Sequence, residues 1–407
     1  MHGHDLGKSN ANGSFRLPPG AMLALTGATI FPSPTHDVVR DGIVLIDGTR
    51  IAAVCERAGS ALPPNAQVVD CSGCTITAGF WNAHVHFFER KWSDAGAIPA
   101  DELDSQHSDT FARFGFTSVF DIGSAWENTR TLRDRIASGE VQGPQIYSTG
   151  EALLPPNALP EESVLRVMGV MNFPAPEISS AKDAAMQAQA LNEKGVDAIK
   201  VFASSPRSVV LTQAVIETVV AEAQRAGKLV FVHPNTADDV MRALRAGVDV
   251  IAHTTPTSGP WNEALLMKAA DQGAALTPTL MLWKSFLRHD RLSTQSAVVE
   301  VALGQLRAWA DAGAAVLFGT DLGAVDSDPK DEYLMMARSG MGFRDILASL
   351  TTTPTGRFSD SRQSGKVAPG FCADLVVLNA DPSRNIAAFA DVRCTIRGGK
   401  IIFRQHS

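Results

Sequence analysis

The central part of the chain alternates short apolar segments with longer amphipathic ones, and this alternation strongly limits the folds that it can adopt. Residues 211–227, 237–247 and 262–273 have apolar positions at helical spacing, and each ends in Gly, a common stop signal for a helix. Strands that alternate with helices form a parallel sheet, and eight repeats predict an α/β fold of the (β/α)8 TIM-barrel type. The eight strands are predicted at residues 75–84, 116–124, 144–150, 197–204, 229–235, 249–255, 274–280 and 315–321.

The two ends of the chain differ from the middle. Residues 22–73 and 367–403 consist of short runs of Val, Ile and Leu separated by Gly and Asp, which is typical of β-strands joined by turns. We expect both ends to meet in one small domain beside the barrel. The expected division is a flexible tail over residues 1–20, a small β-sandwich domain from residues 21–73 plus 365–407, and a barrel domain over residues 74–364.

Composition excludes several classes of partner. The 407 residues include 36 Lys plus Arg against 43 Asp plus Glu, a net charge of −7, and we find no basic run of the kind that binds a nucleic-acid backbone. No stretch has the apolar length that a bilayer requires. The odd number of cysteines argues against a disulfide framework and fits a reducing cytoplasm. They are Cys55, Cys71, Cys74, Cys372 and Cys394, and we expect small buried thiols.

Side chains that bind metals follow five of the predicted strands. His84 and His86 end the first strand, and Val85 between them points to the other face, so both imidazoles face the barrel interior. The His-x-His pattern alone is not specific, because MHGHD at residues 1–5 has it within the polar tail. A lone His in an apolar run is more often a core residue, and a lone Asp after a strand is often a helix N-cap. At the strand ends of one barrel, however, such residues favour a shared site. The set is His84, His86, Lys200, His233, His253 and Asp321.

Lys200 is unusual in this set because it lies in the apolar segment DAIKVF, where an ammonium group is costly to bury. A protonated lysine, with a reference pKa of about 10.4, has no lone pair to give to a metal. If the amine has reacted with CO₂, the resulting carbamate is an anion whose two oxygens can bridge two metal ions. The alternative is a lysine that pairs with a nearby Asp or Glu.

These residues resemble the amidohydrolase superfamily in its two-metal form with a carboxylated lysine. The resemblance spans about residues 22–403, and includes His-x-His on the first strand, Lys on the fourth, His on the fifth and sixth, and Asp on the eighth. The segments PGFCADLVVLNADP and TIRGGKII are similar to the terminal segment of that family. Within the family, the chain resembles the branch of imidazolonepropionase-like, Xaa-prolyl or Xaa-arginyl carboxypeptidase-like and ochratoxinase-like enzymes.

The resemblance implies a hydrolytic reaction on an amide or related C–N bond, with a hydroxide that bridges two divalent metal ions. Zn²⁺ suits such nitrogen and oxygen ligands best, with Mn²⁺, Co²⁺ or Fe²⁺ as alternatives. Asp321 would take the proton of the hydroxide and pass it to the departing nitrogen. We expect a small-molecule substrate and a homo-oligomer, with no nucleic-acid or membrane partner. The implied ligands are His84, His86 and Asp321 for the more buried metal, His233 and His253 for the other, and the Lys200 carbamate between them.

Several other functions, on the same fold or on another, are alternatives to this one. A one-metal deaminase typically carries a Glu three residues after the His of strand five, whereas His233 is followed by Pro-Asn-Thr. A lactonase or cyclic-amidase activity stays open. A phosphotriesterase-like enzyme shares the ligand set, but the β domain from both ends argues against it. A non-catalytic metal-binding or scaffold protein is a further alternative. We find no segment that looks like a partner-docking motif, which argues against it.

Residues just beyond the strand ends are candidates for substrate contacts. A basic side chain could seat a substrate carboxylate, and a tryptophan could contact an aromatic or bulky apolar group. A tyrosine could hydrogen-bond an oxyanion. Each of these residues could equally be a solvated loop charge or part of the core. The main candidates are Trp92, Tyr147, Arg207, Asn235, Trp283 and Lys284, and the wider set adds Glu89, Lys91, Ser124, Trp126, Ser204, Ser205 and Trp261.

Overall fold

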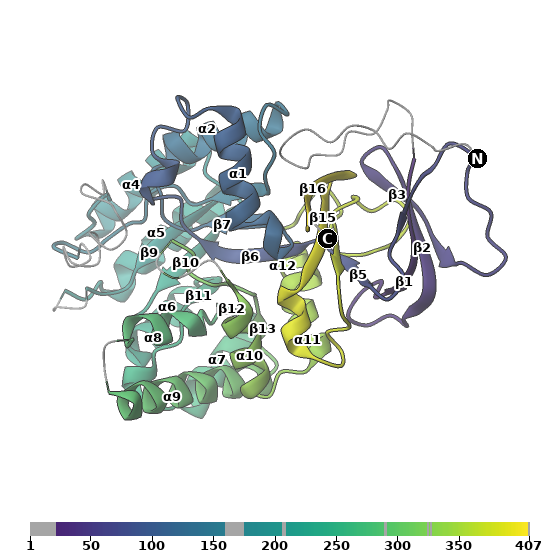
Figure 1. Cartoon of the computed structure of the whole chain (residues 1–407). Helices are drawn as coiled ribbons and strands as arrows, with labels where there is room; N and C mark the ends of the chain where they lie inside the picture. Colours follow the sequence, from purple (N-terminus) through teal and green to yellow (C-terminus); the bar gives the residue numbers. More distant parts are fainter. Residues whose placement is uncertain are drawn as a thin grey trace.

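The two ends of the chain meet in one mixed sheet (Figure 1). The computed structural model describes residues 22–158, 175–205, 209–288, 291–323, 325 and 328–405. Within this part, the sheet has eight strands in the order β16-β15-β14-β5-β1-β2-β3, and β4 also pairs with β1. The strands are β1 (Leu23–Ile30), β2 (Val39–Asp47), β3 (Arg50–Glu56), β4 (Gln67–Asp70), β5 (Thr75–Ala78), β14 (Leu375–Leu378), β15 (Val392–Arg397) and β16 (Lys400–Arg404).

Strands β5 and β14 join the two ends. They pair antiparallel, with Ala78 opposite Leu375. Ile76 on β5 and Val377 on β14 are fully buried, and they share one hydrophobic core with residues of β1 and β2. The five cysteines are free thiols. Strands from both ends of the chain therefore share one mixed sheet and one hydrophobic core.

The middle of the chain forms two parallel sheets. Strands β6, β7 and β8 form one sheet, and β9 to β13 form the other in chain order. Every pairing in these sheets is parallel, so the parallel α/β class was predicted correctly. The strands are β6 (Phe80–Val85), β7 (Phe116–Asp121), β8 (Gln145–Ser148), β9 (Ala198–Phe202), β10 (Leu229–His233), β11 (Val250–Ala252), β12 (Ala275–Thr277) and β13 (Ala315–Val316).

Backbone hydrogen bonds connect the two parallel sheets on both sides. After β8, the amide of Leu153 donates to the carbonyl of Lys200 at 2.8 Å, and the amide of Phe202 donates back to Leu153 at 2.9 Å. After β13, the amide of Asp321 donates to the carbonyl of His84 on β6 at 2.9 Å. These contacts place Lys200 beside the segment after β8, and Asp321 beside His84 on β6.

The segment predicted as one strand over residues 75–84 is two strands, β5 and β6, which lie in different sheets. The break falls at Gly79, where an added Cβ would lie 2.2 Å from Thr117 Oγ1. The backbone therefore passes too close to its neighbour for any larger residue. The amide of Gly79 also donates to the carbonyl of Asp374 at 2.8 Å. Residues 75–78 thus pair with the strands of the two ends, although the predicted barrel domain included them.

Helices pack around the parallel strands (Figure 1). The three helices predicted from apolar spacing are present as α5 (Gln213–Arg225), α6 (Ala237–Ala246) and α7 (Glu263–Gln272). Gly247 and Gly273 follow the last two with φ of 89° and 68°, a left-handed conformation that stops a helix. No described helix is both long and apolar enough to span a bilayer. The other helices are α1 (Ala100–Thr110), α2 (Trp126–Ala137), α4 (Ala181–Lys194), α8 (Leu280–Phe286), α9 (Leu292–Asp311), α10 (Lys330–Arg338), α11 (Phe343–Leu350) and α12 (Thr352–Arg357), with short 3-10 helices at Arg90–Trp92, Ala112–Phe114, Pro256–Ser258 and Ile386–Ala390.

Arg362 links the sheet of the two ends to the parallel strands. Its guanidinium donates to Asp360 at 3.1 Å, to Asp374 at 3.0 Å and to the Ser118 hydroxyl on β7 at 2.9 Å. The two carboxylates are almost fully buried, so each needs this cation. The two parts of the chain are therefore joined by a buried charged network.

Candidate metal centre

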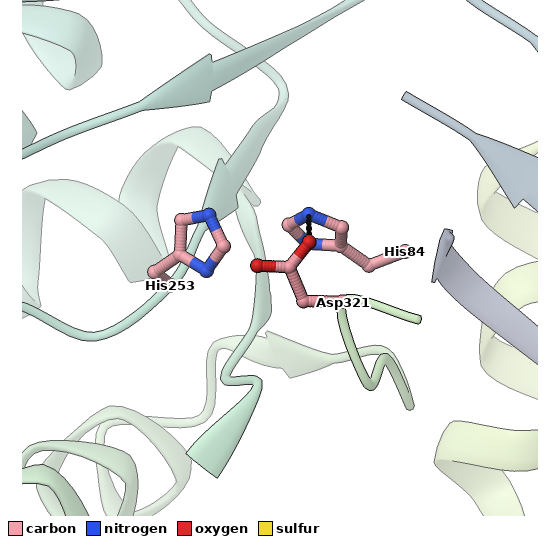
Figure 2. A group of neighbouring side chains, drawn as sticks. All are labelled: His84, His253 and Asp321. Carbon is pink, nitrogen blue, oxygen red and sulfur yellow. Dashed lines mark ion pairs between the residues drawn. The ribbon is translucent and has the colours of Figure 1, made fainter. Parts of the chain in front are cut away.

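Three buried side chains from distant parts of the chain meet where the parallel strands end (Figure 2). His84 lies on β6, His253 directly follows β11, and Asp321 lies in the loop after β13. Their potential ligand atoms all lie within 4.8 Å of one another. Figure 2 shows the two imidazole rings on either side of the carboxylate. Two nitrogens and one oxygen in this arrangement can bind one metal ion.

His86 reaches the same carboxylate. Its Nε2 atom lies 3.0 Å from Asp321 Oδ1, and His84 Nε2 lies 3.3 Å from the same oxygen. Val85 between them is fully buried. The alternation of the strand therefore places both imidazoles on one side, as the sequence predicted.

His233 and Lys200 extend this cluster. The ring of His233 lies 4.7 Å from that of His253, which in turn lies 4.6 Å from the ring of His84. Lys200 is 1% exposed and lies on β9, the strand next to the one that ends in His233. Its ammonium nitrogen lies 5.7 Å from the centre of the Phe202 ring. The six residues predicted as ligands are thus all close to the same ends of the parallel strands.

Burial keeps the imidazoles of His84, His233 and His253 neutral. It lowers the pKa of His84 to about 4, against the opposing effect of Asp321. Burial, and then the charge of Lys200, lowers the pKa of His233 to about 3. Burial also lowers the pKa of His253 well below its ordinary value. At neutral pH these rings therefore keep the lone pairs that a metal ion requires.

Asp321 and Lys200 complete the donor set. Burial alone would raise the pKa of Asp321, but the nearby His84, together with hydrogen bonds from His84 and His86, outweighs it, so this pKa lies well below its usual range and the group is an anion. Burial lowers the pKa of Lys200 to about 7, against the attraction of Asp321. Much of the amine is therefore neutral near pH 7. Neutral imidazoles, a carboxylate and an uncharged amine fit divalent metal ions, which prefer nitrogen and oxygen ligands.

Two residues of this cluster have unusual backbone conformations. His253 has a φ of 76° and Asp321 a φ of 62°, and a residue other than Gly costs about 1–3 kcal/mol in such a conformation. The loop after β13 also runs very close to β6. A Cβ added at Gly319 would lie 2.8 Å from His84 Cβ, and one at Gly323 would lie 3.0 Å from His86 Cβ. Strain of this kind is concentrated at functional sites.

Two threonines contact the Nδ1 atoms of two of these imidazoles. Thr277 Oγ1 lies 3.3 Å from His84 Nδ1, and Thr279 Oγ1 lies 2.7 Å from His253 Nδ1. Sequence reasoning missed both residues, since a threonine after a strand is common. Their partners also lie far away along the chain.

Two aromatic candidates for substrate contact have partners within the protein. Trp92 is fully buried, its ring stacks on that of His107 at 5.1 Å, and its Nε1 donates to Glu89 at 3.2 Å. The hydroxyl of Tyr147 donates to Asp360 at 3.1 Å, and burial raises the pKa of Tyr147 to about 12. Both side chains therefore belong to packed, hydrogen-bonded surroundings.

Asn235 and Trp283 connect the loops that bear the ligands. The amide of Asn235 donates to the Ser204 carbonyl at 2.8 Å, which links the loops after β9 and β10. The indole of Trp283 donates to Thr254 Oγ1 at 2.8 Å, next to His253. Both side chains are half-buried, so they lie near the cluster with part of their surface free.

The two basic candidates that the structure describes form ion pairs with nearby acids. Lys284 forms an ion pair with Asp331, and Lys91 pairs with Glu89 at 3.1 Å. Arg207 lies outside the described residues. The rest of the wider set is buried: Ser124, Trp126, Ser204, Ser205 and Trp261.

The family of the chain follows from a family model. Residues 75–402 match the model of the amidohydrolase family, and the chain belongs to this family. It is accordingly a hydrolase that acts on amide and related C–N bonds. No curated protein matches the chain.

Solved structures share the fold over almost the whole chain. A Xaa-Pro dipeptidase with bound methionine is 20% identical, with a TM-score of 0.80, and the match covers 94% of this chain and 100% of that one. A prolidase complexed with N-methylphosphonate-L-proline is 26% identical, with a TM-score of 0.76 and coverage of 94% and 100%. Ochratoxinase from A. niger is 21% identical, with a TM-score of 0.74 and coverage of 94% and 95%. The amidohydrolase family and the branch were thus predicted correctly.

Proposed function

We propose that the chain is a hydrolase with two divalent metal ions, most simply Zn²⁺, which cleaves an amide or related C–N bond. The observation that carries this proposal is the convergence of four histidines, Asp321 and a buried lysine on one end of the parallel strands. Peptide-like, N-acyl amino acid, cyclic amide and carbamate substrates all contain such a bond. The metal ions and the modified lysine are part of the proposal.

The architecture proposed for this enzyme is one barrel with a small companion domain. The backbone hydrogen bonds that join the two parallel sheets on both sides support a single (β/α)8 barrel. The mixed sheet supports a β-sandwich domain built from both ends. We place the boundary of this domain after Ala78 rather than at residue 74, because β5 pairs with β1 and β14. Barrel enzymes carry their active sites at the carboxyl ends of the strands, where the cluster lies.

In the proposed centre, Lys200 carries a carbamate. The neutral amine attacks the carbon of CO₂, an N–C bond forms and the amine loses a proton to solvent, which leaves an anion with two oxygens. The depressed pKa of Lys200 favours this reaction, since only the neutral amine has a lone pair. When bound, two metal ions would supply Lewis acidity at the substrate carbonyl and activate a water as the nucleophile. The proposed ligands are His84, His86 and Asp321 for one ion, His233 and His253 for the other, and Lys200 between them.

Asp321 is proposed to move the proton. It lies close to histidines proposed for each of the two ions. Its Oδ1 atom contacts His84 and His86, and one of its carboxylate oxygens lies within 4.8 Å of a ring nitrogen of His253. As an anion it can accept a proton from the attacking water and then give it to the departing nitrogen.

The test combines metal analysis with a substrate screen. Purified protein reconstituted with Zn²⁺ and bicarbonate should hold two zinc ions per chain, and ¹³C-labelled bicarbonate should give a carbamate signal in the NMR spectrum. The screen should begin with Xaa-Pro dipeptides, because a prolidase is among the similar structures, and continue with N-acyl amino acids, cyclic amides and carbamates. Chelation should abolish hydrolysis, and added Zn²⁺ should restore it. Full activity with one ion per chain would refute the two-metal centre.

A further inference from the structure

Thr279 has the position of a helix cap but does not act as one. It is the residue before α8 (Leu280–Phe286), and a threonine there usually accepts a hydrogen bond from the first turn of the helix. Its side chain makes no such bond. Its hydroxyl lies instead 2.7 Å from His253 Nδ1. The residue that should satisfy the helix amides is therefore used to hold a histidine of the cluster.

A buried acid from another helix satisfies those amides. Glu332 on α10 accepts from the amides of Leu280 at 2.9 Å and Met281 at 2.8 Å, one with each carboxyl oxygen. It is fully buried, and no lysine or arginine among the described residues pairs with it. Burial raises the pKa of Glu332 to about 8, although the two amides favour the charged form. Such a group is costly to bury, and a capping threonine would have made it unnecessary.

The backbone conformation of Thr279 is unfavourable, and neighbouring residues must impose it. Its φ is 46°, in the left-handed region that β-branched residues rarely adopt. The cost is about 1–3 kcal/mol, so the surroundings must impose it. Glu332 fixes the two residues that follow Thr279, and the amide of His253 donates to the carbonyl of Thr277 at 2.9 Å. The segment from Thr277 to Met281 is therefore held at both ends.

We propose that Glu332 and Thr279 are positioning residues for His253: the carboxyl of Glu332 takes over the cap of α8, and this frees the Thr279 hydroxyl to hold the imidazole. In the tautomer that donates Nδ1–H to the Thr279 hydroxyl, the Nε2 atom carries the lone pair that would meet a metal ion. Thr277 holds His84 by the same atom, so one short segment orients both histidines around Asp321. This inference rests on the proposed metal centre.

Metal affinity tests the inference without reference to activity. Metal-free protein is titrated with Zn²⁺ in competition with a chromophoric chelator, and the variants are Thr279→Val, Thr279→Ser and Glu332→Gln. Val keeps the shape and loses the hydroxyl, whereas Ser keeps the hydroxyl. Glu332→Gln places an amide N–H₂ opposite a backbone N–H. Thr395→Val is the control, because Thr395 on β15 is an equally buried threonine whose hydroxyl donates to the carbonyl of Ala112.

The expected zinc affinities differ between variants in a way that only positioning of His253 explains. Thr279→Val and Glu332→Gln should each weaken zinc binding by about 10- to 100-fold, while Thr279→Ser and Thr395→Val should bind as the wild type does. The double variant should bind no more weakly than Thr279→Val alone, because Glu332 acts through Thr279. If Thr279→Val does not fold, Thr279→Ala makes the same comparison with less strain.

Two results would overturn the inference. Zinc affinity unchanged by Thr279→Val would show that its hydroxyl does not position the ligand. Losses that add in the double variant would show that Glu332 acts by another route. A wild-type protein that binds no zinc would instead refute the proposed metal centre itself.

Discussion

Gly319 packs against His84 and Thr277, and its substitution tests how tightly the loop after β13 lies against the proposed metal centre. In Gly319→Ala, the new Cβ would lie 2.8 Å from His84 Cβ and 3.1 Å from Thr277 Cβ. Carbon atoms prefer separations of about 3.5–4.0 Å, so His84 or the loop must move by roughly 1 Å. The loop cannot move freely, because the next segment is hydrogen-bonded to His84 through the amide of Asp321 at 2.9 Å.

The expected cost can be given a magnitude. Overpacking of a buried site costs about 1–3 kcal/mol, and the φ of Gly319 lies outside the left-handed range, so no strain of that kind adds to it. Gly304 is the matched control, since it lies within α9 and an added Cβ there meets no atom within 4 Å. Gly304→Ala should stabilise the protein by about 0.5–1 kcal/mol, because alanine is the better helix former.

Urea unfolding of the metal-free variants, followed by tryptophan fluorescence, measures this difference. Zinc content after reconstitution measures the displacement of His84. We expect Gly319→Ala to unfold at a lower urea concentration than the wild type and to retain less zinc. Gly304→Ala should unfold at a higher urea concentration and retain as much zinc as the wild type. Equal midpoints for both variants, together with a full zinc content in Gly319→Ala, would refute this view of the packing.

Three further predictions concern single side chains. Lys200→Ala should lose most activity, and short carboxylic acids with zinc should partly restore it; absence of rescue would favour a charged, non-bridging lysine. Asp321→Asn should keep its fold but lower kcat by about 10²–10⁴-fold, and near-normal turnover would exclude the proton transfer. Burial lowers the pKa of His107 to about 4 from 6.5, so His107 contributes stability above pH 6.5 that is lost as the pH falls toward 4. The fall is about 1.4 kcal/mol per pH unit. Acid unfolding of His107→Phe should have a shallower pH dependence, and an identical dependence would contradict it.

Local patterns were enough to predict which side chains gather at the ends of the parallel strands. The alternation of a strand put His84 and His86 on one side, and their Nε2 atoms lie 3.3 and 3.0 Å from Asp321 Oδ1. Lys200 was identified because a lysine within an apolar strand is costly unless its chemistry requires it. These features depend on a few neighbouring residues, so the sequence carries them directly.

Features that depend on distant contacts could not be predicted. Tyr147 was a candidate for substrate contact, but its hydroxyl partner Asp360 lies 213 residues further along the chain. The hydrogen bond between Thr279 and His253 likewise joins the segments after β11 and β12, which are 26 residues apart. The break at Gly79 follows from the approach of Thr117 rather than from any change in the apolar pattern. In each case the deciding atom belongs to another part of the chain, which no local pattern identifies.

The pairing of β5 with β14 has a consequence for synthesis on the ribosome. Residues 75–78 emerge early, but their partners at residues 375–378 follow only after about 300 further residues, on the order of 15–60 s of translation. During that time the nascent sheet has an open edge, which other chains could pair with. The last strands to be made therefore close a structure begun by the first, and a chain that stops short of β14 should aggregate more readily than the complete protein.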